Sequence, residues 1–370
     1  MSLDFRKNIC FTIVGLAVFG FVQQASAIDL SDLIKAVNSI GPEGKGHVAA
    51  IDAMQKLSAQ PSSAIPEMLN GMNGSSRLSV NWLRSAIESA ADKGNLPLAE
   101  IKKFLEDKSN AQLARRLAFE LIVAAQPDQK NAMLAQMLDD PSLEIRRDAV
   151  ELELTKVKNA ADKDQKIAGF KSALNHAREI QQIKSIAESL SELEVEVDLT
   201  KHFGMVTDWH LIGPFPNKDQ SKFDEVYPPE KGIDLNAKYV GDGDKEIGWQ
   251  KHASEEEEGI VDLNKALSNH KGAISYAYTE FVSEKGGEVD VRLGCINANK
   301  VWINGSLIIS NNVYHAGMNL DQYIGKAKLQ PGKNTILIKV CQNEQKEPWA
   351  QRWQFQFRIS DDSGKAIVSK

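Results

Sequence analysis

The chain has 370 residues, of which 42% are hydrophobic, and 44 basic residues face 50 acidic ones, for a net charge of −6. A chain of this length usually forms two domains or more. The mild acidity, with no basic cluster in the sequence, argues against nucleic acid as a partner.

The first 27 residues have the pattern of an export signal. Arg6 and Lys7 form a basic start, residues 9–22 are apolar, and Ala-Ser-Ala at 25–27 is a small-x-small cleavage site. The apolar run is short for a membrane span, and polar, helix-forming sequence follows it. We therefore expect a Sec-type signal peptide at 1–27. The mature chain would be periplasmic or extracellular, with a net charge of −7 and no membrane span.

Composition divides the rest of the chain near residue 200. Residues 28–200 hold four aromatic residues and seven glycines, whereas residues 201–370 hold 17 aromatic residues and 16 glycines. The first part is rich in Ala, Leu, Glu, Lys and Gln, which favour helices, and the second has the composition of strands and turns. We predict an α+β protein with a helical domain at 28–200 and an antiparallel β-sandwich at 201–370.

The helical part contains a repeat. The pentapeptide that begins at Arg84 (R-S-A-I-E) returns at Arg116 (R-L-A-F-E) and at Arg147 (R-D-A-V-E), at offsets of 32 and 31 residues. A period of about 30 residues with two helices in each unit is typical of an α-solenoid. In the last unit, Asp140 is placed to cap a helix that would start at Pro141.

The helical units resemble HEAT repeats over residues 60–160. The stretches F-L-E-D and M-L-D-D each end a helix and each precede an R-R-x-A-x-E-L helix. The resemblance implies a solenoid with a concave face that binds protein. A further helical pair at 162–194 would cap the stack.

The second part shows a series of short strands. They are D-W-H-L-I-G-P-F, Y-A-Y-T-E-F-V, V-D-V-R-L-G-C-I, V-W-I-N-G-S-L-I, L-Q-P-G-K-N-T-I-L-I-K-V and W-Q-F-Q-F-R-I-S-D. The V-W-x-N-G hairpin and the later G-x-N-x-I-x-I-x-V strand resemble the jelly-roll sugar-binding domain found beside family 2 glycoside hydrolases, a galactose-binding-like fold. The resemblance covers residues 270–360 and implies carbohydrate binding. The whole layout is similar to secreted bacterial proteins that join helical repeats to such a domain.

One departure from that family concerns the strand before the hairpin. Related domains often carry acidic residues there, whereas this chain has I-N-A-N at 296–299. The departure argues against transferring a polar or calcium site of the family to this edge of the sheet.

The sequence contains no familiar catalytic or metal-binding motif. It lacks G-x-S-x-G, H-E-x-x-H, a P-loop and C-x-x-C, and the seven histidines show no metal-ligand spacing. Asp242, Asp244 and Glu246 alternate like a calcium loop, but Ile247 stands where glycine is needed. We read them, and the acidic run at 255–258, as solvated turns. A pair of glycosidase carboxylates remains an alternative, because the two need not be close in sequence. We predict a non-enzyme without metal or cofactor.

Three loop residues are the candidates for carbohydrate binding. Tyr314 and His315 follow Asn311-Asn312, and Trp349 follows a proline, so all three should lie in loops. Sugar sites place aromatic faces against pyranose rings, and loops on a rigid scaffold carry such contacts. The alternative is that these aromatic residues pin their loops to the sandwich.

Trp302 lies beside a predicted two-residue turn at Asn304-Gly305. A type I′ turn there would pair Ile303 with Ser306, Trp302 with Leu307, and Val301 with Ile308. Both faces of this hairpin would then be apolar. We therefore predict that Trp302 packs against the rest of the chain, although it stays a possible ligand contact.

Beyond the signal peptide only Cys295 and Cys341 remain, and export makes a disulfide the first expectation. Strand alternation places Cys295 with Val291 and Leu293, but puts Cys341 on the face opposite Val340. One thiol would point inward and the other outward, which opposes a bond unless a bulge intervenes.

These features favour a secreted, non-catalytic binding protein. The helical part would bind a protein partner, and the sandwich would bind carbohydrate weakly. The alternative is a structural or adhesive module of the cell envelope that binds no sugar, and an unrecognised glycoside-active enzyme is a third.

Overall fold

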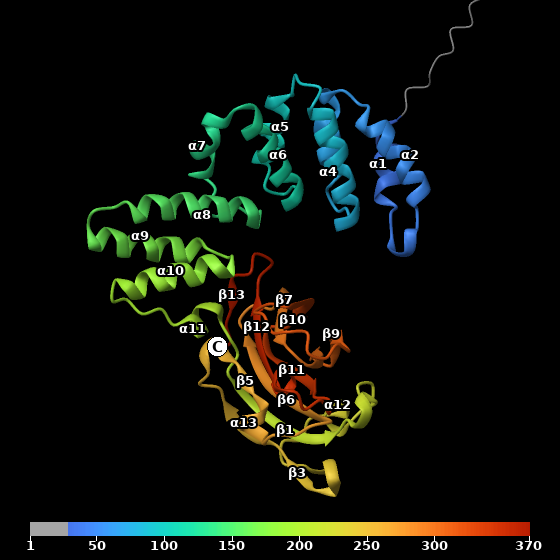
Figure 1. Ribbon diagram of the computed structural model, residues 1–370, viewed down its shortest axis with the longest axis vertical. Helices are drawn as coiled ribbons and strands as arrows, with labels where there is room; N and C mark the ends of the chain where they lie inside the picture. Colours follow the sequence, from blue (N-terminus) through green and yellow to red (C-terminus); the bar gives the residue numbers. More distant parts are fainter. Residues whose placement is uncertain (1–28) are drawn as a thin grey trace, which may run out of the picture. The chain divides into compact units, whose positions relative to one another are not determined.

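The computed structural model describes residues 29–370 (Figure 1). The predicted signal peptide at 1–27 lies outside this range and stays a prediction. The described chain is α+β, with helices up to residue 203 followed by antiparallel strands. Within the described residues, no helix has the length and apolar character needed to cross a membrane.

The chain divides into two compact units, Met1–Phe104 and Leu105–Lys370. The compositional boundary near residue 200 instead marks the point where helices give way to strands. The helices at the start of the chain are α1 (Leu30–Asn38), α2 (His47–Ser58), α3 (Ile65–Asn70), α4 (Arg77–Ala91) and α5 (Leu98–Glu106), the last of which ends in the second unit.

Helix α4 shows why these segments are helical. The Ser76 hydroxyl caps its first turn by accepting a hydrogen bond from the Ser79 amide at 3.1 Å. Val80, Leu83 and Ile87 then recur every three or four residues and are buried. This spacing forms the single apolar stripe of an amphipathic helix.

The second unit begins with six helices of the described chain and continues into the sheets. The helices are α6 (Gln112–Ala125), α7 (Lys130–Leu134), α8 (Leu143–Lys158), α9 (Lys163–His176), α10 (Ile180–Glu192) and α11 (Leu199–Phe203). Val150 of α8, Phe170 of α9 and Ile186 of α10 belong to one buried cluster. The predicted helical pair at 162–194 matches α9 and α10.

The predicted start of helix α8 is wrong. Helix α8 begins at Leu143 with Ser142 at the N-cap position, and neither Asp140 nor Pro141 caps it. The Asp140 carboxylate instead forms a two-pronged ion pair with Arg115 of α6, with Nη2 and Oδ2 at 2.7 Å, and both side chains are 1% exposed. The guanidinium takes both oxygens because a carboxylate and an arginine fork match in shape.

The strands of the second unit form two antiparallel sheets and one small hairpin (Figure 1). The larger sheet has the order β4-β1-β6-β11-β8-β9, from Gln250–Ala253, Asp208–Pro216, Ala273–Ser283, Gly332–Cys341, Ala298–Ile303 and Ser306–Asn311. The smaller sheet has the order β10-β7-β12-β13, from Tyr323–Leu329, Gly287–Cys295, Gln354–Ser360 and Ala366–Ile367, with β5 (Val261–Asp262) paired to β12. The hairpin is β2 (Lys238–Val240) with β3 (Glu246–Gly248), and two short helices, α12 (Pro228–Lys231) and α13 (Leu263–Leu267), lie in the connections.

The two sheets enclose a common core. Val291 and Leu293 of the smaller sheet and Ile336 and Ile338 of the larger sheet belong to one buried cluster, together with Trp353. We call this pair of sheets the sandwich. Because side chains alternate along a strand, the larger sheet has an inner face on this core and an outer face that carries a different set of residues.

The Trp302 hairpin has the predicted turn but not the whole predicted register. Asn304 and Gly305 both have positive φ, 49° and 79°, as a type I′ turn requires. Trp302 pairs with Leu307 as predicted, but Val301 pairs with Ile309 because Ile308 forms a bulge. The bulge turns Ile309 inward, where it is 6% exposed, and so the predicted pairing of Val301 with Ile308 is wrong.

The end of the helical segment joins the smaller sheet. Met205 forms an antiparallel bridge with Arg358 of β12, and the Val206 amide donates to the Phe357 carbonyl at 2.9 Å. Figure 1 shows α10 and α11 next to the end of the sandwich that carries β13. The helices after Leu105 and the sandwich are therefore part of one compact unit.

The cysteines follow the strand alternation. Cys295 lies in the cluster between the sheets, whereas Cys341 lies in a second cluster on the outer face of the larger sheet. Both are buried free thiols. The parity argument is confirmed, and no bulge brings the two together.

Candidate functional site

A continuous row of side chains crosses the outer face of the larger sheet. Trp302 pairs with Leu337, Leu337 with Tyr278, and Tyr278 with His210. Directly paired residues of neighbouring antiparallel strands share a face and lie about 5 Å apart. Two aromatic rings, one aliphatic side chain and one imidazole therefore lie side by side over four strands.

Residues 217–249 cover one half of this face. The Lys339 ammonium, fully buried, donates to the Glu230 carboxylate at 3.0 Å and to the Glu225 carbonyl at 2.7 Å. The Tyr276 hydroxyl also donates to Glu230. These bonds fasten the covering segment to the sheet, and its residues 229–233 line a hollow beside Trp302 and Leu337.

The half of the face near Trp302 and Tyr278 is hollowed into two adjoining cavities. One, of about 540 Å³, is lined by His210, Tyr278 and Glu280 of the sheet. The other, of about 430 Å³, is lined by Tyr278, Trp302 and Leu337, with Thr335. Since Tyr278 lines both, we treat them as one site and call it the groove, formed by His210, Tyr278, Glu280, Trp302, Thr335 and Leu337.

Trp302 lines the groove without being fully exposed. It is partly buried and packs on the outer cluster that also holds Tyr278 and Leu337. The prediction that Trp302 packs against the rest of this chain is therefore confirmed. Its partner across the hairpin, Leu307, is 51% exposed.

A carboxylate and a hydroxyl provide polar contacts at the groove. Glu280 pairs with Lys333 at 2.8 Å and accepts a hydrogen bond from the Tyr278 hydroxyl at 3.1 Å. The hydrogen bond from Lys333 holds the pKa of Glu280 below its usual value. Burial, and then the hydrogen bond to Glu280, raise the pKa of Tyr278 to about 12, so this hydroxyl stays protonated and remains a donor at neutral pH.

Trp249 borders the same cluster from the covering segment. Its ring meets that of Tyr278 edge to face, with centroids 6.3 Å apart. Its Nε1 is buried and has no hydrogen-bond partner among the described residues. Buried indole N–H groups usually find a partner, and so this one is an unused donor next to the groove.

Of the three predicted loop residues, two lie together. His315 and Trp349 meet edge to face with ring centroids 5.0 Å apart, and Trp349 is 57% exposed. His315 has a left-handed backbone with φ of 58°, and its Nε2 lies 3.0 Å from the Asn343 amide oxygen. Its Nδ1 is buried and has no hydrogen-bond partner among the described residues.

Tyr314, the third predicted loop residue, does not join His315 and Trp349. Its hydroxyl accepts a hydrogen bond from Asn217 at 3.0 Å, and its ring packs on the outer cluster of the larger sheet. Burial raises its pKa to about 12. Tyr314 thus pins its loop, as the alternative reading expected, and the structure does not unite it with His315 and Trp349.

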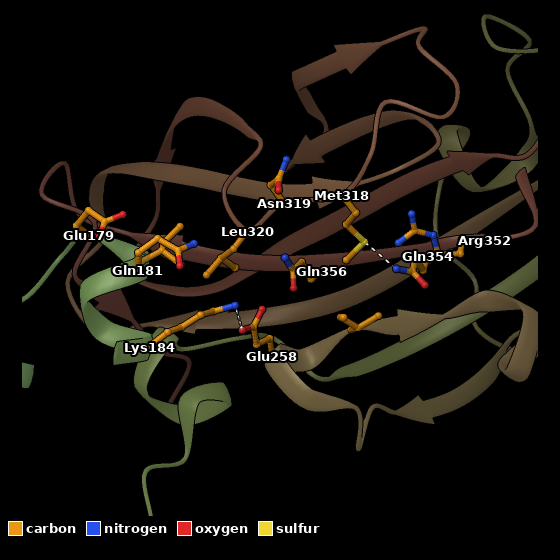
Figure 2. Close-up of a pocket in the computed structure, with 12 residues that line it drawn as sticks. Glu179, Gln181, Lys184, Glu258, Met318, Asn319, Leu320, Arg352, Gln354 and Gln356 are labelled. Atoms are coloured by element: carbon orange, nitrogen blue, oxygen red, sulfur yellow. Dashed lines mark hydrogen bonds and ion pairs between the residues drawn. The ribbon is translucent and has the colours of Figure 1, made fainter. Parts of the chain in front are cut away.

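A polar pocket of about 320 Å³ lies where α10 meets the sandwich (Figure 2). Figure 2 shows Lys184 of α10 pointing toward Glu258, with which it forms an ion pair, while Gln354 and Gln356 of β12 line the pocket. The prediction that the acidic run at 255–258 is solvated throughout is wrong at Glu258. The ion pair with Lys184 holds this carboxylate, whose side chain is only 15% exposed.

Among the described residues, no cluster of three or more His, Cys, Asp or Glu side chains could hold a metal ion. Residues 242–246 are exposed, as expected of the turn predicted there. Ligand contacts at the groove would therefore have to come from the aromatic, hydroxyl and carboxylate groups described above.

The sequence search missed most of the groove. Tyr276, Tyr278 and Glu280 alternate with Ala277 and Phe281 in Y-A-Y-T-E-F. This alternation carries a signal, because it separates a polar and aromatic face from an apolar one. What it lacks is the information that residues 217–249 cover Tyr276 and line the hollow beside Tyr278.

No protein-family model matches the chain, and no curated protein matches it. The chain is similar in parts to solved structures. These include a β-glucosidase from Kluyveromyces marxianus (13% identity, TM-score 0.26, 43% of this chain and 16% of that one) and a β-glucuronidase from Faecalibacterium prausnitzii (16% identity, TM-score 0.22, 37% of this chain and 21% of that one).

A third similar structure is an anti-sigma factor domain-containing protein from Clostridium clariflavum, with 14% identity and a TM-score of 0.24, covering 45% of each chain. In all three cases the match spans less than half of the solved chain. The neighbours include glycosidases, but scores at this level carry no argument about function.

Proposed function

We propose that this chain is a non-catalytic binding protein whose sandwich holds carbohydrate weakly in the groove. The observation that carries the proposal is the row of Trp302, Leu337 and Tyr278 along a hollow that also contains Glu280. Pyranose rings have apolar faces that pack on aromatic side chains, and their hydroxyls need a few fixed hydrogen-bonding groups. The groove offers both.

The carboxylates argue for binding rather than hydrolysis. A glycosidase needs one carboxyl group that stays protonated to act as a general acid. Glu280 has its pKa lowered by Lys333, and Glu230 accepts hydrogen bonds from Lys339 and Tyr276. The environment of Glu280 does not favour the protonated acid, so this group is better suited to accept hydrogen bonds from sugar hydroxyls.

The remaining parts of the proposal concern architecture and location. The helices at 28–200 would form a HEAT-like solenoid that binds a protein partner, and the sandwich at 201–370 would be a galactose-binding-like jelly roll. The chain would be exported to the periplasm or the extracellular space by the segment at 1–27. The pattern of repeats, the two sheets and the signal-like start support this arrangement.

Affinity electrophoresis through gels that contain a polysaccharide tests the groove. Over a broad glycan panel, we expect at least one polysaccharide to retard the wild-type chain. Trp302→Ala should weaken that binding about tenfold, since it removes an aromatic face that the sugar would cover. Glu280→Gln should weaken it less, by about threefold, because it keeps the shape and removes only the charge. Circular dichroism would confirm that each variant is folded.

Trp349→Ala is the matched control. This tryptophan is more exposed than Trp302 and belongs to the loop site that the sequence favoured, so the groove proposal expects unchanged retardation. Loss of binding in Trp349→Ala alone would move the site to the loops. The absence of retardation with every glycan would contradict sugar binding and favour the envelope module, and release of reducing sugar would identify an enzyme.

A further inference from the structure

A further cavity in the second unit is lined by cationic side chains. It has a volume of about 210 Å³ and lies between the loop that joins α9 to α10, the helix α11 and the hairpin of β12 and β13. Four of its lining residues carry basic side chains, namely Arg178, His202, Arg358 and Lys365. Among the described residues, no acidic side chain lines it.

Arg178 of this cavity forms no ion pair with a carboxylate among the described residues. Its Nη1 donates to the carbonyls of Asn175 and Ala177, at 2.8 and 2.6 Å, and these are neutral acceptors. Its Nε is buried and has no partner among the described residues. A buried arginine nitrogen without an acceptor costs the free energy of its lost hydration, which a bound acceptor would restore.

The nearest carboxylates are occupied elsewhere. Asp361 and Asp139 are close enough to act on Arg178 through their charge. Yet Asp361 accepts hydrogen bonds from the backbone amides of Ser363 and Lys365, at 2.9 Å each, and Asp139 binds His176 at 2.9 Å. Neither forms an ion pair with Arg178.

Arg358, the other arginine of the cavity, is by contrast neutralised. Its Nε donates to Asp321 at 2.8 Å, and Asp321 also accepts from Arg292 at 2.8 Å. Arg292 in turn pairs with Asp290 at 2.9 Å, so two guanidinium groups face two carboxylates. Of the two arginines that line the cavity, Arg178 is therefore the one that no carboxylate of the described residues neutralises.

The titration behaviour of the lining groups agrees with a positive local field. Burial lowers the pKa of His202, and the charges of Arg178 and Arg358 lower it further. Burial likewise lowers the pKa of Arg178, and the charge of Arg146 adds to this. Cations that disfavour one another's charge in this way create a site that a negative ion would stabilise.

We propose that this cavity binds a small oxyanion, held mainly by the Arg178 guanidinium with Lys365 at its edge. Guanidinium groups match the paired oxygens of phosphate, sulfate and carboxylate, so these ions share the chemistry. The oxyanion could be a free inorganic ion or the carboxylate of an acidic monosaccharide. The site is independent of the groove, because other strands form it.

Isothermal titration calorimetry on the full chain tests the proposal. Sodium phosphate, sodium sulfate and sodium glucuronate would each be titrated at an ionic strength held constant with sodium chloride, with glucose as the neutral control. We expect saturable binding of at least one anion and none of glucose. Tightest binding of phosphate or sulfate would identify an inorganic source, and tightest binding of glucuronate an acidic sugar.

Variants assign the site. Arg178→Gln should weaken the anion about tenfold or more, the loss expected for hydrogen bonds to a charged group. Lys365→Ala should weaken it about threefold, since an exposed charge contributes less. The Lys365 backbone amide still donates to Asp361 in this variant, so the local fold is kept. Weaker binding in Lys365→Ala would therefore support the site even if Arg178→Gln failed to fold. Arg77→Gln, an equal change of charge at an exposed position in the first unit, should leave the affinity unchanged.

Two results would overturn the proposal. One is the absence of saturable binding for all three anions. The other is equal affinity in the wild type, Arg178→Gln and Lys365→Ala, which would place the anion elsewhere on the chain. Because Trp302→Ala assigns the groove and Arg178→Gln assigns the cavity, failure of one site leaves the result for the other intact.

Discussion

Trp302 lies in a hairpin whose two faces are both apolar in sequence, and the structure gives each face a different neighbour. Val301 and Ile303 enter the core between the sheets, while Trp302 packs on the outer cluster and lines the groove. Packing and ligand contact are therefore compatible roles for this ring. The sequence alone could not show this, because the residues that surround Trp302 come from distant strands and from residues 217–249.

The cysteines allow a direct test at the residue scale. Burial raises the pKa of both Cys295 and Cys341 to about 12. Because the thiolate is the reactive form, we expect neither to react with a thiol reagent such as 5,5′-dithiobis(2-nitrobenzoic acid) in the native protein at pH 8. Both should react after unfolding in guanidinium chloride without a reductant.

Electrophoresis-based peptide mapping of the labelled chain would locate the two modified positions. Protection of both thiols even in the denatured, unreduced chain would mean that a disulfide joins them. Rapid labelling of the native protein would contradict the buried positions. Single variants, Cys295→Ser and Cys341→Ser, would show which thiol is exposed in that case.

At the scale of secondary-structure elements, the start of α8 shows a conflict between local and tertiary preference. The D-P pair at 140–141 is a good local signal for a helix start. The Asp140 carboxylate is nevertheless used by Arg115 of α6, and so α8 begins two residues later than predicted. The loss of one cap costs about 1 kcal/mol, less than the cost of an unpaired buried arginine.

Asp140→Ala should therefore be strongly destabilising. The substitution leaves the buried Arg115 charge without its partner, and we expect the free energy of unfolding to fall by about 3 to 5 kcal/mol. Urea denaturation followed by circular dichroism would measure it.

The control for this variant lies on the surface of α8. Glu153 forms an exposed ion pair with Lys156 at 3.2 Å, so Glu153→Ala should change the free energy of unfolding by less than about 1 kcal/mol. If both variants lost the same small amount, the Arg115–Asp140 pair would be dispensable. The capping role predicted from sequence would then be the better account of Asp140.

At the scale of the whole molecule, Asp321 links three parts of the second unit. Its carboxylate binds Arg358 of β12 and Arg292 of β7, and Arg358 also donates to the Phe203 carbonyl at the end of α11. Burial raises the pKa of Asp321, but the hydrogen bonds and charges of the two arginines outweigh burial and lower it overall. The native state therefore favours the ionised form.

This shift predicts acid sensitivity. A carboxylate with a lowered native pKa stabilises the fold fully above its unfolded pKa, about 3.9, and loses that contribution as the pH falls through the native value. Asp321→Asn should reduce stability at pH 7 and flatten the dependence of stability on pH below about 4. Urea denaturation midpoints measured from about pH 2.5 to about pH 7 would show both effects.

Asp244→Asn, at an exposed turn, serves as the control and should follow the wild-type profile. An unchanged pH dependence in Asp321→Asn would show that other carboxylates govern the acid limb. Unchanged stability at pH 7 would show that the two arginines do not need this partner.

The sequence by itself determined the order of the elements, since hydrophobic spacing, turn residues and composition are local properties of the chain. The α+β class, the change from helices to strands near residue 200, the type I′ turn at Asn304-Gly305 and the opposite faces of the two cysteines follow from such local patterns. The bulge at Ile308 changed one pair of that hairpin. Ile309 instead of Ile308 pairs with Val301, and Ile309 is buried in the core between the sheets.

Only the tertiary structure decided which surfaces can hold a ligand. The groove depends on cross-strand pairing between residues up to 68 positions apart, His210 with Tyr278, and on a covering segment that lines one side of it. The cationic cavity depends on Asp361 and Asp139 being bound to other groups than Arg178. Long-range packing and competition for hydrogen-bond partners determine both the groove and the cavity. Neither site produces a periodic pattern in the sequence.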